Sequence, residues 1–361
     1  MNDHGSQPRC RITDAVPDRG PRAVRIENDL LAATILVDKG ADIVELIYKP
    51  REMDVLWKSP WGSFAGTGVR AADSQVAWLE SYEGGWQELF PNAGDSCLYK
   101  GVELGFHGEA SLAGWQWEIV EAAGDAAELK LWTRLRRSPF LLERWMRVEA
   151  GRPLLMIRER ITNEGGEVMD YMWGHHPAYG APFLSETCRV DTGARSVRAD
   201  DLYDGPANPL PPDGRFPWPV VERDGRLADL SQVPGPRTPR QTFAYLHDFA
   251  GEHGWYGLTN TALGFGVGFV WPTRVFPYAW FWQEMHATPG FPWYQRVYVM
   301  AIEPFSSIPG QGLAAVIEKT GSHRTLAPGQ TVEAELRAVF YESRTGIEQI
   351  MPDGAVVTRA R

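Results

Sequence analysis

The sequence Glu128-Leu129-Lys130-Leu131-Trp132-Thr133-Arg134-Leu135 places leucine at 129, 131 and 135, with mostly polar residues between these positions. Alternation with a period of two is typical of a β-strand that buries one face. The pattern returns at 142–148, 154–163 and 331–340, and nearer the N-terminus at 23–27 and 41–48. No long stretch combines helical periodicity with capping residues. The sequence therefore predicts an all-β sandwich.

The strand pattern also sets the expected domain organisation. The chain has 361 residues, which is within reach of one large all-β domain. Residues 1–22 lack periodicity and are expected to form a flexible N-terminal arm. Residues 23–345 are expected to form a single domain, with a proline-rich loop excursion at 203–240. Residues 346–361 are expected to form a C-terminal tail.

The composition excludes several classes of function. The formal net charge is −10 and the pI is about 5.4, so no basic field exists to bind nucleic acid. The widely spaced Cys10, Cys97 and Cys188 suggest neither a disulfide framework nor a zinc motif. The N-terminus is polar, and no apolar run of roughly 18 residues occurs. We expect a cytoplasmic protein with a small-molecule partner and no membrane span.

Two adjacent histidines, His175 and His176, stand between aromatic residues and are followed by Pro177. Neighbouring side chains on a strand point to opposite faces, so only one histidine can face a given pocket. The proline biases His176 toward an extended backbone and so fixes its direction. An imidazole held in this way can transfer protons near neutral pH. A structural histidine pair at a strand end would have the same sequence.

Three further segments, 84–95, 105–110 and 301–307, place polar side chains among glycine, proline and aromatic residues. Strand ends that line a cleft have this composition. Glu303 ends an apolar run and precedes a proline, which makes its carboxyl a candidate for a raised pKa and for a general base. A solvated glutamate at a strand exit is the alternative.

Aromatic residues make up 12% of the chain, including 15 tryptophans. Their flat apolar faces and polar edges suit sugar rings, although a large β core is also rich in aromatic residues. The segment 276–284 is strongly aromatic and ends in Gln283 and Glu284. It is a candidate sugar-binding wall.

In their order and spacing, these segments resemble the aldose 1-epimerase (galactose mutarotase-like) family over about residues 23–342. The resemblance rests on the segments Lys39-Gly40-Ala41-Asp42-Ile43, Pro91-Asn92-Ala93-Gly94, His107-Gly108, Ile161-Thr162-Asn163-Glu164-Gly165, His176-Pro177-Ala178-Tyr179, Glu303-Pro304 and Leu326-Ala327-Pro328-Gly329-Gln330.

The resemblance implies a supersandwich of two large, mostly antiparallel β-sheets. It also implies an isomerase that interconverts the α and β anomers of an aldose, with no cofactor and no metal. Glu303 would be the general base at the C1 hydroxyl, His176 the acid at the ring oxygen, and His107 a contact on the ring-oxygen side. Hemiacetal opening needs one proton removed and one delivered, which a glutamate and a histidine can do.

The chain departs from the family where an arginine is expected, because Asp95 and Ser111 occupy those positions. Arg70 is the candidate replacement and Asp248 a candidate acidic contact. A phosphorylated substrate is doubtful, since a phosphate would call for an arginine pair. The other expected sugar contacts are Trp86 and Trp282 for stacking, Gln283 for a hydroxyl, and Asn92 and His175 beside the site.

Two alternatives stay open. One is a carbohydrate-binding β-sandwich without activity, in which Glu303 and His176 only form hydrogen bonds with hydroxyls. The other is a metal-dependent sugar isomerase, in which His107, Glu109 and a second histidine converge as ligands of zinc type.

Overall fold

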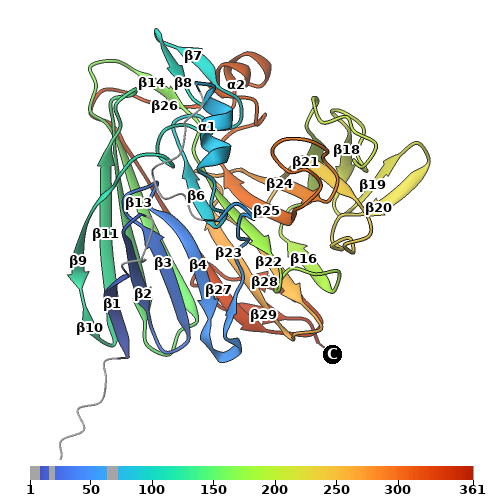
Figure 1. The fold of residues 1–361 in the computed structure, drawn as a ribbon, viewed down its shortest axis with the longest axis horizontal. Helices are drawn as coiled ribbons and strands as arrows, with labels where there is room; N and C mark the ends of the chain where they lie inside the picture. The colour runs from blue at the N-terminus through green and yellow to red at the C-terminus, as the bar shows by residue number, and fades with distance from the viewer. Residues whose placement is uncertain (1–8, 16–20, 63–71, 361) are drawn as a thin grey trace, which may run out of the picture.

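The computed structural model describes residues 9–15, 21–62 and 72–360, and these form a sandwich of two large sheets (Figure 1). Over this part of the chain one sheet has 13 strands and the other has eight. Neighbouring strands in both sheets run antiparallel. The predicted all-β supersandwich is therefore confirmed.

The larger sheet has short strands near its two edges and long buried strands near its centre. In spatial order it consists of β10 (Ala123–Gly124), β1 (Cys10–Ala15), β2 (Ala23–Glu27), β3 (Leu31–Leu36), β4 (Asp42–Tyr48), β6 (Trp86–Leu89), β15 (Gly174–Gly180), β25 (Tyr298–Phe305), β24 (Tyr278–Met285), β21 (Arg240–His247), β17 (Ser196–Ala199) and β18 (Arg215–Pro217), with β5 (Met53–Asp54) beside β4.

The smaller sheet contains four of the alternating runs that predict the fold, at 128–135, 142–148, 154–163 and 331–340. Its order is β16 (Cys188–Thr192), β22 (His253–Asn260), β23 (Phe265–Pro272), β27 (Thr331–Glu342), β13 (Leu154–Asn163), β12 (Phe140–Glu149), β11 (Ala126–Arg134) and β9 (Gln116–Glu121). In β12 buried and half-buried positions alternate from end to end. This strand therefore buries one face against the larger sheet, as its period of two predicts.

Short hairpins and helices complete the described chain. The hairpins are β7 (Cys97–Tyr99) with β8 (Val102–Leu104), β14 (Met169–Tyr171) with β26 (Arg324–Leu326), β19 (Val220–Arg223) with β20 (Arg226–Asp229), and β28 (Ile347–Ile350) with β29 (Val356–Thr358). The helices are the 3-10 turn η1 (Lys49–Arg51), α1 (Ser74–Glu80) and α2 (Leu313–Lys319).

The central strands of the larger sheet are buried on both faces. One face packs against the smaller sheet, where Ile302 of β25 lies in the main hydrophobic core. On the other face, Ala301 of the same strand joins a second apolar cluster with Trp78 of α1 and Leu313 of α2. All residues of β15 are buried as a result. The two helices thus cover an outer face that would otherwise be open to solvent.

Two boundary predictions need correction. Residues 10–15, predicted within the flexible arm, form β1, which pairs with β2 and β10 and leaves Cys10 fully buried. Residues 346–361, predicted as a tail, contain the hairpin β28–β29, whose Ile347 and Ile350 are buried. Pairing with β2 and with the distant β10 orders β1, whereas the local hairpin β28–β29 is ordered by packing against Leu154, Val270 and Val339.

The proline-rich excursion at 203–240 also has more structure than a loop. It contains β18 and the hairpin β19–β20, which turns at Asp224 and Gly225. Both turn residues have positive φ, of 51° and 74°, which suits an Asp-Gly hairpin turn. The single domain over residues 23–345 stays a prediction.

A buried ion network joins the two sheets beneath the central strands. Arg144 of β12 contacts Glu88 of β6 at 2.6 Å and Glu159 of β13 at 2.7 Å. All three side chains are almost completely shielded from solvent. Burial together with Glu159 raises the pKa of Glu88. Burial would also raise the pKa of Glu159, but contacts with His175 and Arg144 outweigh it and lower that pKa.

We expect Arg144→Leu to lower the free energy of unfolding by about 3–5 kcal/mol, because it leaves two buried carboxylates without their cation. Urea denaturation followed by circular dichroism measures the change. The matched control is Arg134→Leu, which removes an exposed arginine paired with Glu164. A loss for Arg144→Leu no larger than for this control would show that the network does not stabilise the sandwich.

Candidate active site

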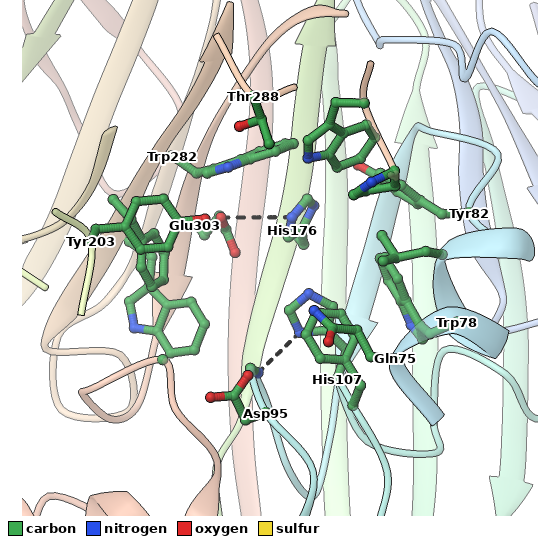
Figure 2. A pocket seen from close by; sticks show the side chains of 18 of the residues that line it. Gln75, Trp78, Tyr82, Asp95, His107, His176, Tyr203, Trp282, Thr288 and Glu303 are labelled. Atoms are coloured by element: carbon green, nitrogen blue, oxygen red, sulfur yellow. Dashed lines mark hydrogen bonds and ion pairs between the residues drawn. The ribbon is translucent and has the colours of Figure 1, made fainter. Parts of the chain in front are cut away.

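A cavity of about 300 Å³ lies on the outer face of the larger sheet, between its central strands and α1 (Figure 2). This volume is at the lower end of the range typical of small-molecule sites. Aromatic side chains form most of its walls: Trp78, Tyr82, Phe106, Tyr203, Phe243, Trp280, Trp282 and Trp293. The polar side chains that line it are Gln75, Asp95, His107, His176, Gln241, Thr288 and Glu303.

Strand register brings His176 and Glu303 together. The pairs Gly174–Phe305 and Ala178–Ala301 align β15 with β25, which sets His176 opposite Glu303 midway between them. Nε2 of His176 lies 3.8 Å from Oε1 of Glu303, and Figure 2 shows the two groups facing each other. Trp280 of β24 is the cross-strand partner of Glu303 on the far side. A row of side chains across adjacent strands thus forms the floor of the cavity.

Both groups of this pair are buried without a complete set of partners. Glu303 is 1% exposed, and its Oε2 has no hydrogen-bond partner within the described residues. Burial raises the pKa of its carboxyl well above the usual range. His176 is 6% exposed, and its Nδ1 likewise has no partner in the described part of the chain. Burial lowers the pKa of His176 to about 4. Burial therefore favours the uncharged form of both residues.

His107 presents a hydrogen-bond donor to the same cavity. Its Nδ1 accepts a hydrogen bond of 3.0 Å from the backbone N–H of Gly94. Burial, and then the neighbouring His176, lower the pKa of His107 well below its ordinary value. A neutral ring whose Nδ1 accepts carries its proton on Nε2. His107 can therefore donate through Nε2 but cannot serve as a base through Nδ1.

Backbone geometry fixes this contact. His107 has a φ of 57°, in the left-handed region that residues other than glycine seldom adopt. Gly94 has a φ of 72°, and a Cβ there would lie 1.8 Å from the carbonyl oxygen of Gly310. Only glycine allows the chain to pass so close while its N–H reaches the imidazole.

The helix α1 supplies one aromatic wall. Asp73 caps its first turn by accepting a 2.9 Å hydrogen bond from the N–H of Val76. Trp78 stacks on Tyr82 with ring centroids 4.7 Å apart, and the indole of Trp78 donates to Ser111. The hydroxyl of Tyr82 is buried and has no hydrogen-bond partner among the residues that the structure describes. Opposite, Trp282 lies 5.7 Å from His176, centroid to centroid.

Four of the predicted site residues come together in this cavity: Glu303, His176, His107 and Trp282. Arg70 lies outside the described residues, so its predicted role stays a prediction. The remaining predicted contacts do not line the cavity, and each has a structural reason.

Trp86 and His175 point to the inner face of the larger sheet, so the predicted sugar contacts of both are corrected. Trp86 packs against Phe269 in the core between the sheets. Its indole donates a 3.2 Å hydrogen bond to Nδ1 of His175, whose Nε2 lies 2.9 Å from Glu159. His175 thus belongs to the buried ion network rather than to the cavity.

Gln283, Asn92 and Asp248 are corrected for similar reasons. Gln283 follows Trp282 on β24 and therefore faces the core between the sheets, where both of its amide atoms lack partners. Asn92 is fully buried, donates to the carbonyls of Asp95 and Gly105, and accepts from the N–H of Leu313. Asp248 is exposed beyond the end of β21 and pairs with His247.

The sequence prediction missed the α1 wall and Tyr203. Trp78 and Tyr82 are four positions apart, a spacing that puts two rings on the same side of a helical turn. That spacing is only a weak signal here, because α1 ends at Glu80 and Tyr82 lies two residues beyond it. Tyr203 comes from the proline-rich excursion, whose irregular backbone gives no local signal of direction.

The described residues contain no candidate metal cluster and no helix suited to crossing a membrane. Within the ranges given above, no group of three or more His, Cys, Asp or Glu side chains is arranged to hold a metal ion. None of the helices in those ranges has the length and hydrophobicity that a membrane crossing requires.

Solved structures with similar folds carry mutarotase-related names. A galactose mutarotase-like protein from Clostridium acetobutylicum matches with a TM-score of 0.65 and 16% identity, covering 92% of this chain and 99% of that one. A galactose mutarotase related enzyme from Lactobacillus acidophilus matches with a TM-score of 0.58 and 18% identity, covering 89% and 98%. A galactose mutarotase-like protein from Lactobacillus casei matches with a TM-score of 0.56 and 16% identity, covering 88% and 100%. At these identities the likeness shows the fold, which is galactose mutarotase-like.

The comparison with curated proteins gave no match. Residues 18–339 match a family described as a domain of unknown function, DUF4432. Because this match spans most of the chain, the protein belongs to the DUF4432 family.

Proposed function

We propose that this protein is a mutarotase, an enzyme that interconverts the α and β anomers of an aldose. The observation that carries the proposal is the pair formed by Glu303 and His176, 3.8 Å apart on the floor of an aromatic cavity. Each group has a further buried polar atom without a partner. The ring oxygen and the C1 hydroxyl of a sugar are bonded to the same carbon, so two groups this close can reach both oxygens.

The reaction needs only proton transfers. A base removes the proton of the C1 hydroxyl while an acid protonates the ring oxygen, and the bond between C1 and that oxygen breaks. The aldehyde group rotates, and the reverse transfers close the ring on the other face. Following the family resemblance, Glu303 is the base and His176 the acid during opening, and the roles reverse on closure. No electrons leave the sugar, and no net proton is consumed.

The number of protons that the pair of Glu303 and His176 holds fits this mechanism of ring opening. Burial raises the pKa of the Glu303 carboxyl and lowers that of His176, so it favours a pair that holds a single proton, with Glu303 as the favoured site. The same single proton on His176 gives the form that starts ring opening. Because the two groups lie in one buried site, their titration belongs to the pair rather than to either residue.

The remaining walls are suited to holding a sugar ring. Nε2–H of His107 can donate to an oxygen on the ring-oxygen side of the substrate. Trp282 offers a flat apolar surface next to His176. The mutarotase-related names of the structural relatives lend further support.

Glu303→Gln is expected to fold and to lower the catalytic rate by about 10²–10⁴, because the amide keeps the shape but cannot take up the C1 proton. Polarimetry or NMR exchange measures the rate after subtraction of spontaneous anomerisation. Glu333→Gln, which changes an exposed glutamate of β27, is the control and should behave as wild type. A Glu303→Gln variant with wild-type rates would remove Glu303 from the reaction.

His176→Asn and His175→Asn are expected to have different effects, the first on catalysis and the second on stability. His176→Asn should lower the rate at saturating sugar, because an amide cannot deliver a proton to the ring oxygen. His175→Asn should mainly lower stability, because it leaves Glu159 without one of its partners. The comparison requires both variants at a temperature where each is fully folded. If His176→Asn has a normal rate and His175→Asn has a strongly reduced rate, His175 rather than His176 is the acid.

The pH profile of kcat/KM should be bell-shaped and displaced from that of an ordinary histidine. Activity should fall on the acid side near pH 4, because His176 is then protonated while Glu303 also keeps its proton, so the pair holds two protons. It should fall on the alkaline side where Glu303 loses its proton, well above the usual range for a carboxyl. Between these limits the pair holds one proton and the rate should be level. A single transition near the ordinary histidine value of about 6.5 would contradict this state of the pair.

A further inference from the structure

The end of the cavity around Asp95 is acidic. The Asp95 carboxylate lines the cavity, is exposed to it and forms no hydrogen bond or ion pair with the described residues. In Figure 2, Asp95 and Trp282 lie on opposite sides of the pair formed by Glu303 and His176. A substrate oriented by that pair would therefore extend toward Asp95 at one edge.

Tyr203 is a second polar group in the cavity wall that lies near acidic side chains. Its ring lines the cavity, and its hydroxyl has no hydrogen-bond partner within the described residues. Burial is the first cause of its raised pKa, and the charges of Glu284, Asp200 and Asp95 add to it. Three carboxylates thus act on one phenol.

No lysine or arginine offsets this charge among the described residues that line the cavity. The nearby Lys319 is held 2.7 Å from Asp201 and 2.7 Å from the amide oxygen of Gln311. Bringing a phosphate or carboxylate to this corner would place like charges close together with no compensating cation. A hydroxyl or an ammonium group, by contrast, can donate to Asp95, and an ammonium would also lie against aromatic faces.

We infer that the cavity selects sugars without negative charge, and that Asp95 determines this selection by accepting hydrogen bonds from a hydroxyl or ammonium group at the edge of the sugar. The inference rests on the proposed function, because it takes the sugar to be oriented by Glu303 and His176. It adds a substrate class, neutral and amino sugars as opposed to uronates and sugar phosphates.

The test compares matched forms of one hexose: D-galactose, D-galactosamine, D-galacturonate and D-galactose 6-phosphate, with the D-glucose series in parallel. Binding is measured by calorimetry and turnover by NMR exchange. Wild-type protein should bind the two anionic forms at least about tenfold more weakly than the neutral and amino forms. In Asp95→Asn, the difference in affinity between the anionic forms and the neutral and amino forms should fall to less than about threefold. The control Asp224→Asn changes the net charge equally at a side chain that is 88% exposed, and should leave the gap unchanged.

A second measurement on the wild-type protein needs no variant. Between about 0.01 M and about 1 M salt the Debye length falls from roughly 30 Å to 3 Å. The discrimination against anionic sugars should shrink over this range, while binding of D-galactose or D-glucose stays level. Equal binding of neutral and anionic sugars by the wild type, or an unchanged gap in Asp95→Asn, would overturn the inference.

The two proposals fail in different ways. If the wild type accelerates exchange of neutral and anionic sugars alike, the selection by Asp95 is wrong and the mutarotase proposal stands. If the binding gap and its loss in Asp95→Asn are found without any acceleration of exchange, the selection stands and the mutarotase proposal is wrong.

Discussion

The site depends on the register between β15 and its neighbours β6 and β25. Antiparallel pairing sets His176 opposite Gln87 on one side and opposite Glu303 on the other. A shift of one residue in either pairing would turn every side chain of β15 to the other face. The cavity would then contain His175 in place of His176. The spacing of 3.8 Å between the carboxylate and the imidazole is thus a property of the sheet.

The buried ion network opposes such a shift. His175 lies between Trp86 of β6 and Glu159 of the smaller sheet, and Arg144 joins Glu159 to Glu88. These contacts exist only when His175 faces inward. Buried charges that lose a partner are strongly destabilising. The contacts on the inner face of β15 therefore fix the register of this strand, and with it the direction of His176 on the outer face. In this account His175 matters for the position of His176 without touching the sugar.

The alternation of apolar and polar residues along strands is the clearest signal in the sequence, and most of the correct predictions rest on it. The all-β fold follows from runs such as 128–135 and 154–163. The contrast between His175 and His176 follows from the same rule. Because neighbouring side chains on a strand point to opposite faces, Trp282 and Gln283 cannot both face one cavity, and only Trp282 does. The phase of a strand as short as β6 cannot be read from its sequence, which is why Trp86 was placed in the site.

Features made by distant contacts could not be predicted in this way. Asn92 lies in the expected segment, yet its side-chain amide accepts from the backbone N–H of Leu313, which is 221 residues away in the sequence. The wall containing Trp78 comes from a helix that precedes the central strands of the cavity. Tyr203 comes from an irregular excursion. Strands set the floor of the site by local pattern, whereas the walls are set by which connecting segments fold back over it.

The central claim is that this cavity transfers protons to and from a sugar, rather than only binding it. The most direct measurement is two-dimensional NMR exchange between the α and β anomer signals of a panel of free aldoses, with and without wild-type protein. The account predicts that at least one neutral aldose exchanges much faster with protein than without it, in proportion to protein concentration. Binding of an aldose with an exchange rate equal to the spontaneous rate would contradict the account and leave a carbohydrate-binding protein in its place.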